Sequence, residues 1–192
     1  MNTPAHLLMG AAVFGRPAQT KILLAAFFGA VLPDLSLYVM AGTSLLILGI
    51  SPQRVFNELY FSDAWQTVFA IDNSFILWGI LCLVAIWWRR PWAVALTGAA
   101  LLHLCLDFPL HHDDGRPHFW PMSNWVFESP VSYWDSAQGA NWVAPIELVM
   151  ALACGVVLLV RRVPIWAVPL TLVLMAAEIW IVRQWLFFFT NS

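Results

Sequence analysis

The sequence predicts an all-α, polytopic transmembrane helical bundle with a short N-terminal helix and a second helix broken at a proline. The 192-residue chain is 61% hydrophobic and 10% charged, whereas soluble domains carry about 25% charged residues. Several apolar runs approach the roughly 20 residues that a helix needs to cross a bilayer. These runs are continuous, whereas the strands of a transmembrane barrel alternate between apolar and polar residues, so a helical bundle is favoured.

The bulk composition also limits the architecture and the partners. One integral membrane domain, residues 1–192, is the economical interpretation, because the chain has no internal repeat. A formal net charge of -2 argues against a nucleic-acid partner, which would need a basic patch. No basic segment precedes the first apolar run, so no cleavable signal peptide is expected. Three cysteines lie in apolar segments without CxxC spacing and are expected to pack as small hydrophobic residues: Cys82, Cys105 and Cys154.

The first two apolar segments differ in length. Thr3 and Pro4 form a helix start, as N-cap and first helical residue. The apolar run 5–14 is too short to span a membrane at about 1.5 Å per residue, so we expect a short or partly inserted helix. Residues 21–50 form one long apolar stretch, in which Pro33 removes a backbone donor and predicts a kink or break.

Loops and membrane-crossing runs alternate through the rest of the chain. A polar and aromatic segment, residues 51–71, is expected to form a loop along the membrane interface. Residues 111–142 form the longest expected loop, which is rich in Trp, Pro, Asp and Ser. The remaining apolar runs are interpreted as membrane-crossing helices: 72–88, 92–108, 143–160 and 164–189.

The basic residues indicate the orientation in the membrane. Alternating spans place six of them on one side, which the positive-inside rule makes cytoplasmic: Arg16, Lys21, Arg89, Arg90, Arg161 and Arg162. The loops 51–71 and 111–142 are then external, and in a Gram-negative bacterium they are periplasmic. We therefore predict a multi-pass protein of the bacterial inner (plasma) membrane, with its polar site facing the periplasm or the exterior.

The stretch 103–121 concentrates ionisable side chains in an otherwise apolar chain. It contains four of the five histidines, three of the eleven carboxylates and Arg116. His103 and Asp107 are four residues apart, and this spacing puts both on one face of a helix. Asp34 is a further carboxylate inside an apolar run, and ionisable residues within a membrane are functional candidates.

The rise of a helix indicates how deep these groups lie. Asp34 lies roughly 20 Å above Lys21 in a core of about 30 Å, and His103 lies roughly 16 Å above Trp92. We therefore predict that Asp34 and His103 share one wall of a cavity and are close enough to share a ligand. The same reasoning puts all the buried ionisable groups in the outer half of the membrane: His6, Asp34, His103, Asp107, Glu147 and Glu178.

These residue types favour a metal site. Two histidines and two aspartates are a normal ligand set for zinc, manganese or iron. A divalent ion, zinc or manganese, is predicted at four residues: His6, Asp34, His103 and Asp107. Such an ion would offset the cost of burying the carboxylates and lower the pKa of a bound water to about 7. Groups in the loop just above it, beside Asp114, are candidates for general acid–base catalysis and for holding a phosphate or carboxylate: His111, His112, Asp113, Arg116 and His118.

Three motifs resemble a known family. TPAHLLMGAAVFG, LPDLS and HLCLDFPLHHDDGRPHFWP are similar to motifs of the YdjM-like (DUF457) inner-membrane metal-dependent hydrolases. The resemblance covers about the first 125 residues and implies the same four metal ligands. Ser36 stands where the family has a second Asp, and Asn73 where it has a His. Either the loop histidines supply the missing ligands, or the metal site has decayed and the scaffold serves another purpose.

Two functions are consistent with these patterns. The first is a membrane-embedded metal-dependent hydrolase, acting on a lipid or phosphoester-like substrate in the outer half of the bilayer. The second is a non-enzymatic membrane subunit, or a small-solute or ion-binding protein, whose polar groups form a hydrogen-bonded network or an ion path.

Overall fold

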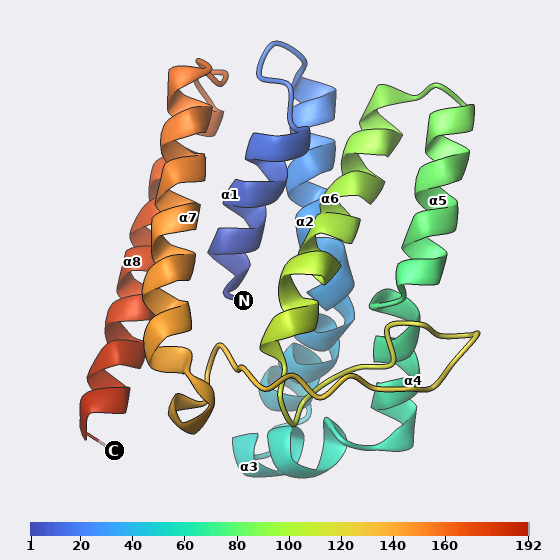
Figure 1. The fold of residues 1–192 in the computed structure, drawn as a ribbon, viewed down its shortest axis with the longest axis vertical. Coiled ribbons are helices and arrows are strands. Elements are labelled where there is room, and N and C mark those ends of the chain that lie inside the picture. The colour runs from blue at the N-terminus through green and yellow to red at the C-terminus, as the bar shows by residue number, and fades with distance from the viewer. Residues whose placement is uncertain (192) are drawn as a thin grey trace.

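The computed structural model describes residues 1–191, with side chains described through residue 188. Within this part of the chain all regular structure is helical, which confirms the predicted all-α bundle (Figure 1). Five helical stretches in it are long and apolar enough to cross a membrane: Thr20–Ile47, Asp63–Trp87, Pro91–Leu110, Ala140–Val160 and Ala167–Phe188. The chain is therefore built as a multi-pass membrane protein.

The short helix α1 (Thr3–Phe14) lies at the centre of the bundle (Figure 1). It packs against α2, α6, α7 and α8, and most of its residues are buried. The side chains of α1 itself are mostly apolar on every side of the helix, so no face of it is suited to water. A helix of this kind packs inside a bundle. The hairpin formed by α7 (Ala140–Val160) and α8 (Ala167–Asn191) packs chiefly on α1. The central helix thus connects this hairpin to the rest of the bundle.

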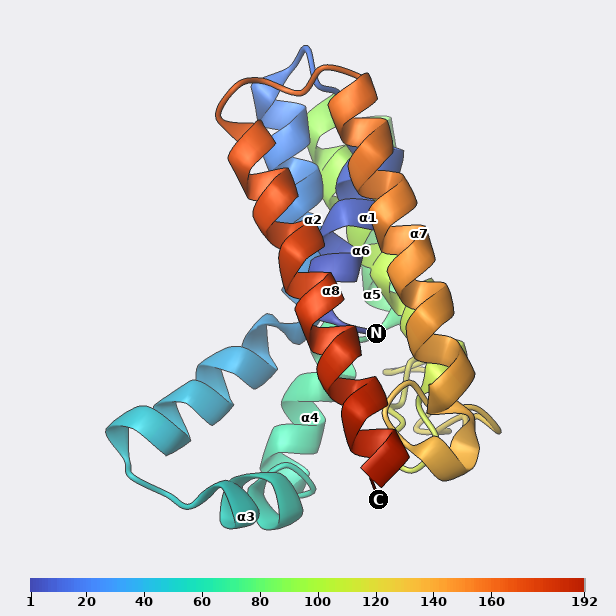
Figure 2. The same cartoon turned by 90° about the vertical axis from the view of Figure 1, so that its left-hand side faces the viewer.

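Helix α2 (Thr20–Gly42) passes through Pro33 without stopping and continues into a π-helical segment, Thr43–Ile47. Of the predicted kink or break at Pro33, the break is not found: the helix continues, and its later part leans away from the bundle (Figure 2). A proline inside a helix removes one backbone hydrogen bond, which permits a bend without ending the helix. Earlier in α2, Gly29 packs so closely on α6 that an added Cβ would lie 2.0 Å from the carbonyl oxygen of Leu96.

The segment 51–71, predicted to be a loop, is mostly helical, and that prediction is wrong. It contains a short helix, α3 (Pro52–Arg54), a π-helical segment, Val55–Leu59, and most of α4 (Asp63–Asp72). The polar residues of α4 obscure it in the sequence: Asp63 and Thr67 are exposed, while Phe69 is buried. Helix α5 (Phe75–Trp87) follows at once, with its first turn capped by the Ser74 hydroxyl.

The two ends of the bundle differ in character. The turns that join α1 to α2, α5 to α6 and α7 to α8 gather at one end (Figure 1). At the other end, α6 (Pro91–Asp107) continues through a 3-10 turn, Phe108–Leu110, into the long loop that precedes α7. This loop runs from residue 111 to 139 and agrees closely with the predicted 111–142. The loop end is where the buried ionisable residues converge.

Candidate metal centre

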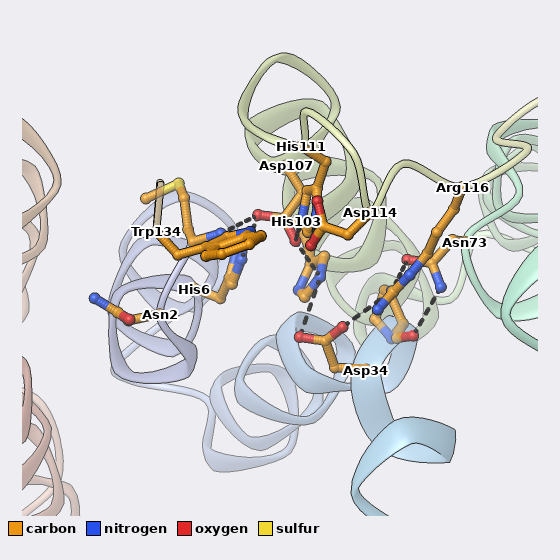
Figure 3. A network of polar contacts seen from close by, with 12 residues as sticks. Asn2, His6, Asp34, Asn73, His103, Asp107, His111, Asp114, Arg116 and Trp134 are labelled. Carbon is orange, nitrogen blue, oxygen red and sulfur yellow. Dashed lines mark hydrogen bonds and ion pairs between the residues drawn. The ribbon is translucent and has the colours of Figure 1, made fainter. Parts of the chain in front are cut away.

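Three helices bring the predicted metal ligands together. His6 comes from α1, Asp34 from α2, and His103 and Asp107 from α6. All four are buried, and Figure 3 shows their side chains pointing toward one another. The predicted proximity of Asp34 and His103 is confirmed, because Nε2 of His103 lies 3.7 Å from Oδ2 of Asp34. One ligand atom from each of His6, His103 and Asp107 fits within a group 4.8 Å across.

His103 is oriented by a backbone contact on the side away from this group. Its Nδ1 lies 2.8 Å from the carbonyl oxygen of Ala30, and because a carbonyl only accepts, Nδ1 carries the proton. Nε2 then faces Asp107 Oδ2 at 3.2 Å and Asp34 Oδ2 at 3.7 Å. Placed among carboxylate oxygens, Nε2 is suited to hold either a proton or a metal cation. Metal-binding histidines usually have their second nitrogen held in this way.

His6 completes the group from the opposite side. Its ring stacks on the ring of His103, with centroids 3.7 Å apart and planes 15° from parallel. Nε2 of His6 lies 2.9 Å from Asp107 Oδ1, and the Met1 amine lies 2.6 Å from the same oxygen. Nδ1 of His6 is buried and has no hydrogen-bond partner among the residues that the structure describes. Both carboxylate oxygens of Asp107 thus face cationic or donor groups.

His111 extends the cluster from α6 into the loop. Its Nε2 lies 3.6 Å from Asp107 Oδ2, and its Nδ1 lies 2.9 Å from Asp114 Oδ2. Burial lowers the pKa of His111, but Asp107 and Asp114 outweigh burial, and the net pKa is raised. Burial raises the pKa of Asp114, but His111 outweighs it and holds that pKa below the usual value. Of the predicted catalytic histidines, His111 is the one that joins the metal-ligand group.

Arg116 is buried and bound to protein groups at the side of the cluster. Its Nη1 donates to Asn73 Oδ1 at 2.8 Å and to Asp34 Oδ1 at 3.3 Å (Figure 3). Burial lowers the pKa of Arg116, but Tyr60 and Asp34 raise it, and the net direction is upward. The guanidinium therefore stays charged and bridges Asp34 to Asn73. It also lines the cavity of about 690 Å³ that is described below.

The other predicted catalytic residues are dispersed. His112 faces away, with Nδ1 2.6 Å from the Ser129 carbonyl oxygen and Nε2 3.8 Å from Glu128. His118 packs among aromatic rings, including Phe75 and Phe108, and burial lowers its pKa to about 4. Asp113 is exposed and lies on the cavity wall. The structure therefore brings His111, Arg116 and Asp113 to the cavity, and leaves His112 and His118 outside it.

Two further predicted carboxylates form a second buried group behind the first. Glu147 of α7 accepts a hydrogen bond from the Asn2 backbone N–H at 2.5 Å, and Glu178 of α8 accepts one from the Asn2 side chain at 3.1 Å. Both carboxylates are almost fully buried. They anchor the start of α1, four residues before His6.

A cavity of about 690 Å³ opens above the metal-ligand group. Asp34, Asp107 and His111 lie on its polar side. The rest of its wall is largely aromatic and comes from α2, the segment after α3, the long loop and α8: Tyr38, Phe56, Tyr60, Phe61, Tyr133, Trp134 and Trp185. A polar base with aromatic walls is suited to a ligand that has a polar head and an apolar body.

Sequence reasoning missed two residues of the site. Asn73 was identified only as a departure from a motif, yet it is buried and accepts from Arg116. Tyr133, in the long loop, packs its ring edge-on to His111 with centroids 5.3 Å apart. Only the position of Asn73 at the start of a span, next to Ser74, could have signalled its role. No family model, curated protein or solved structure matches this chain.

Proposed function

We propose that the protein is a membrane-embedded, metal-dependent hydrolase that binds a divalent ion, zinc or manganese, at His6, Asp34, His103 and Asp107. The observation that carries the proposal is the orientation of His103. The Ala30 carbonyl fixes its Nδ1 as a donor and leaves Nε2 facing two carboxylates. A divalent cation satisfies all of these groups together, and two histidines with two carboxylates are a donor set that zinc and manganese accept.

The cavity residues supply the rest of the chemistry. When bound, the ion would supply Lewis acidity and a water of lowered pKa. His111 contacts both Asp107 and Asp114 and is placed to exchange a proton with a molecule in the cavity. Arg116, whose charge is held beside Asp34, is placed to attract an anionic group such as a phosphoester. Asp34 would thus hold both the ion and Arg116.

The substrate we propose is a lipid or a lipid-like phosphoester. Support comes from the cavity, whose aromatic wall would bury an apolar body while its polar base receives the ester. We also propose that the chain is related to the YdjM-like (DUF457) hydrolases it resembles. In this proposal it lies in a bacterial inner membrane with the cavity toward the periplasm or the exterior, as the basic turns at the opposite end favour.

A second candidate function is a non-enzymatic solute- or ion-binding protein on the same scaffold. It is favoured by the unbroken series of carboxylates and imidazoles in contact across the site, which can hold protons in place of a metal: Asp34, His103, Asp107, His111 and Asp114. The Met1 amine beside Asp107 adds a positive charge to this network.

Metal analysis of gently purified protein distinguishes the two functions. The hydrolase requires about one tightly bound transition-metal ion per chain, measured by elemental analysis. His103→Ala should abolish binding, whereas His112→Ala is the matched control, because His112 faces Ser129 and should leave metal content unchanged. Absence of metal in the wild type, together with no thermal shift on adding zinc or manganese, would exclude the hydrolase and favour the network.

A further inference from the structure

The end of the bundle opposite the candidate metal centre is strongly basic. Six of the nine Lys and Arg residues lie in or beside its three turns, and none of the eleven acidic residues does. Two of these cations have partners within the protein. Lys21 lies over the Trp92 ring at 4.7 Å, and Arg161 donates to the Ala12 carbonyl oxygen at 2.6 Å. Only part of the positive charge at this end is therefore paired with groups of the protein itself.

A cavity of about 470 Å³ opens at this end, between the α1–α2 turn and the α5–α6 turn. Its base is apolar and buried, with Ile22 of α2 and Ala95 of α6. Arg16 and Arg89 lie at its edge, one from each turn. The remaining lining is apolar and includes two exposed side chains, Val13 and Ile86. The cavity thus combines two guanidinium groups with an apolar surface that continues to the outside of the helices.

The two arginines at this cavity form no ion pair and no side-chain hydrogen bond within residues 1–188, whose side chains the structure describes. Guanidinium groups bind phosphate oxygens in bidentate fashion, and two of them without a nearby carboxylate favour a ligand of net negative charge. Basic pockets between membrane helices recognise lipid headgroups through this combination of charges and apolar lining.

We propose that this cavity binds the headgroup of an anionic membrane phospholipid. Arg16 and Arg89 hold its phosphate, and the start of its acyl chains lies along Val13 and Ile86. A zwitterionic lipid fits less well, because its ammonium group finds no carboxylate at this end. The site is separate from the candidate metal centre and does not depend on the hydrolase function.

Native mass spectrometry of the purified full chain tests the site. Phosphatidylglycerol and phosphatidylcholine with identical acyl chains are titrated separately, and the wild type should bind the anionic lipid more tightly. The double variant R16Q/R89Q should weaken phosphatidylglycerol binding roughly tenfold to thirtyfold, as expected for two surface arginines. The matched control is R90Q/R162Q, which removes the same charge from the same end but outside the cavity, and should retain most of the binding.

A third variant tests the cavity without removing any positive charge, so that effects of arginine loss on folding or membrane orientation do not enter. Val13→Trp keeps every arginine but fills part of the cavity from an exposed position, and it should also weaken phosphatidylglycerol binding. Equal losses in the two arginine pairs would show a general surface-charge effect and overturn the site. No preference of the wild type for the anionic lipid would overturn it too. Displacement of the lipid by millimolar inorganic phosphate would identify a free anion as the ligand and overturn the lipid assignment.

Discussion

At the residue scale, Asp34 and His103 are expected to act as one unit. Their facing atoms are 3.7 Å apart, and each also contacts a group that fixes it, Arg116 and Ala30 respectively. Asp34→Asn and His103→Ala should therefore each abolish metal binding, measured by isothermal titration with zinc. The double variant should be no worse than either single variant, because residues of one network are not additive. Losses that simply add would contradict a shared site.

The sequence could predict the parts of this site that depend on helix geometry. The i,i+4 spacing of His103 and Asp107, and the depth of Asp34 along its helix, are properties of a regular backbone. The direction in which a loop side chain points is not set by a regular backbone. His111 and His112 are adjacent, yet one faces Asp107 and the other faces the Ser129 carbonyl, because tertiary contacts decide the turn between them. For the same reason the partnership of Asn73 with Arg116, 43 residues apart, could not be predicted.

At the element scale, the close approach of α2 and α6 holds Asp34 against His103. Gly29→Ala would place a Cβ 2.0 Å from the Leu96 carbonyl oxygen, and a backbone atom cannot move aside as a side chain can. We expect a destabilisation of about 1–3 kcal/mol or more, with reduced metal content. The matched control is Gly79→Ala in α5, where an added Cβ meets no atom within 4 Å. Thermal unfolding in detergent should separate the two, and equal behaviour would contradict the packing argument.

The apolar pattern of the sequence predicted some of the helices well and others poorly. The pattern predicted α6, α7 and α8 closely, because their apolar runs are continuous and each is bounded on one side by a basic pair or a proline. At Pro33 it left a kink and a break both open, and the helix bends and continues there, since the structure tolerates one lost hydrogen bond. It failed in α4, because Asp63 and Thr67 face outward and dilute the apolar signal of the buried face.

At the scale of the whole molecule, the separation of basic turns from buried acids predicts a single orientation. In a background without Cys82, Cys105 and Cys154, a cysteine placed at Ser136 should react with an impermeant thiol reagent added from outside intact cells. A cysteine placed at Arg90, at the opposite end of the bundle, should not react until the membrane is opened. The reverse labelling pattern would place the candidate metal centre toward the cytoplasm.

The anchoring of α1 by the last two helices has a consequence for biosynthesis. Helix α1 leaves the ribosome before all the others, yet the carboxylates that hold Asn2 belong to α7 and α8. Until that hairpin has entered the membrane, the segment carrying His6 lacks the anchor just upstream of it. A nascent chain that stops before α7 therefore carries all four candidate ligands but lacks the contacts that anchor the helix bearing His6. Under the proposed function, loading of the ion would be delayed until α7 and α8 have entered the membrane.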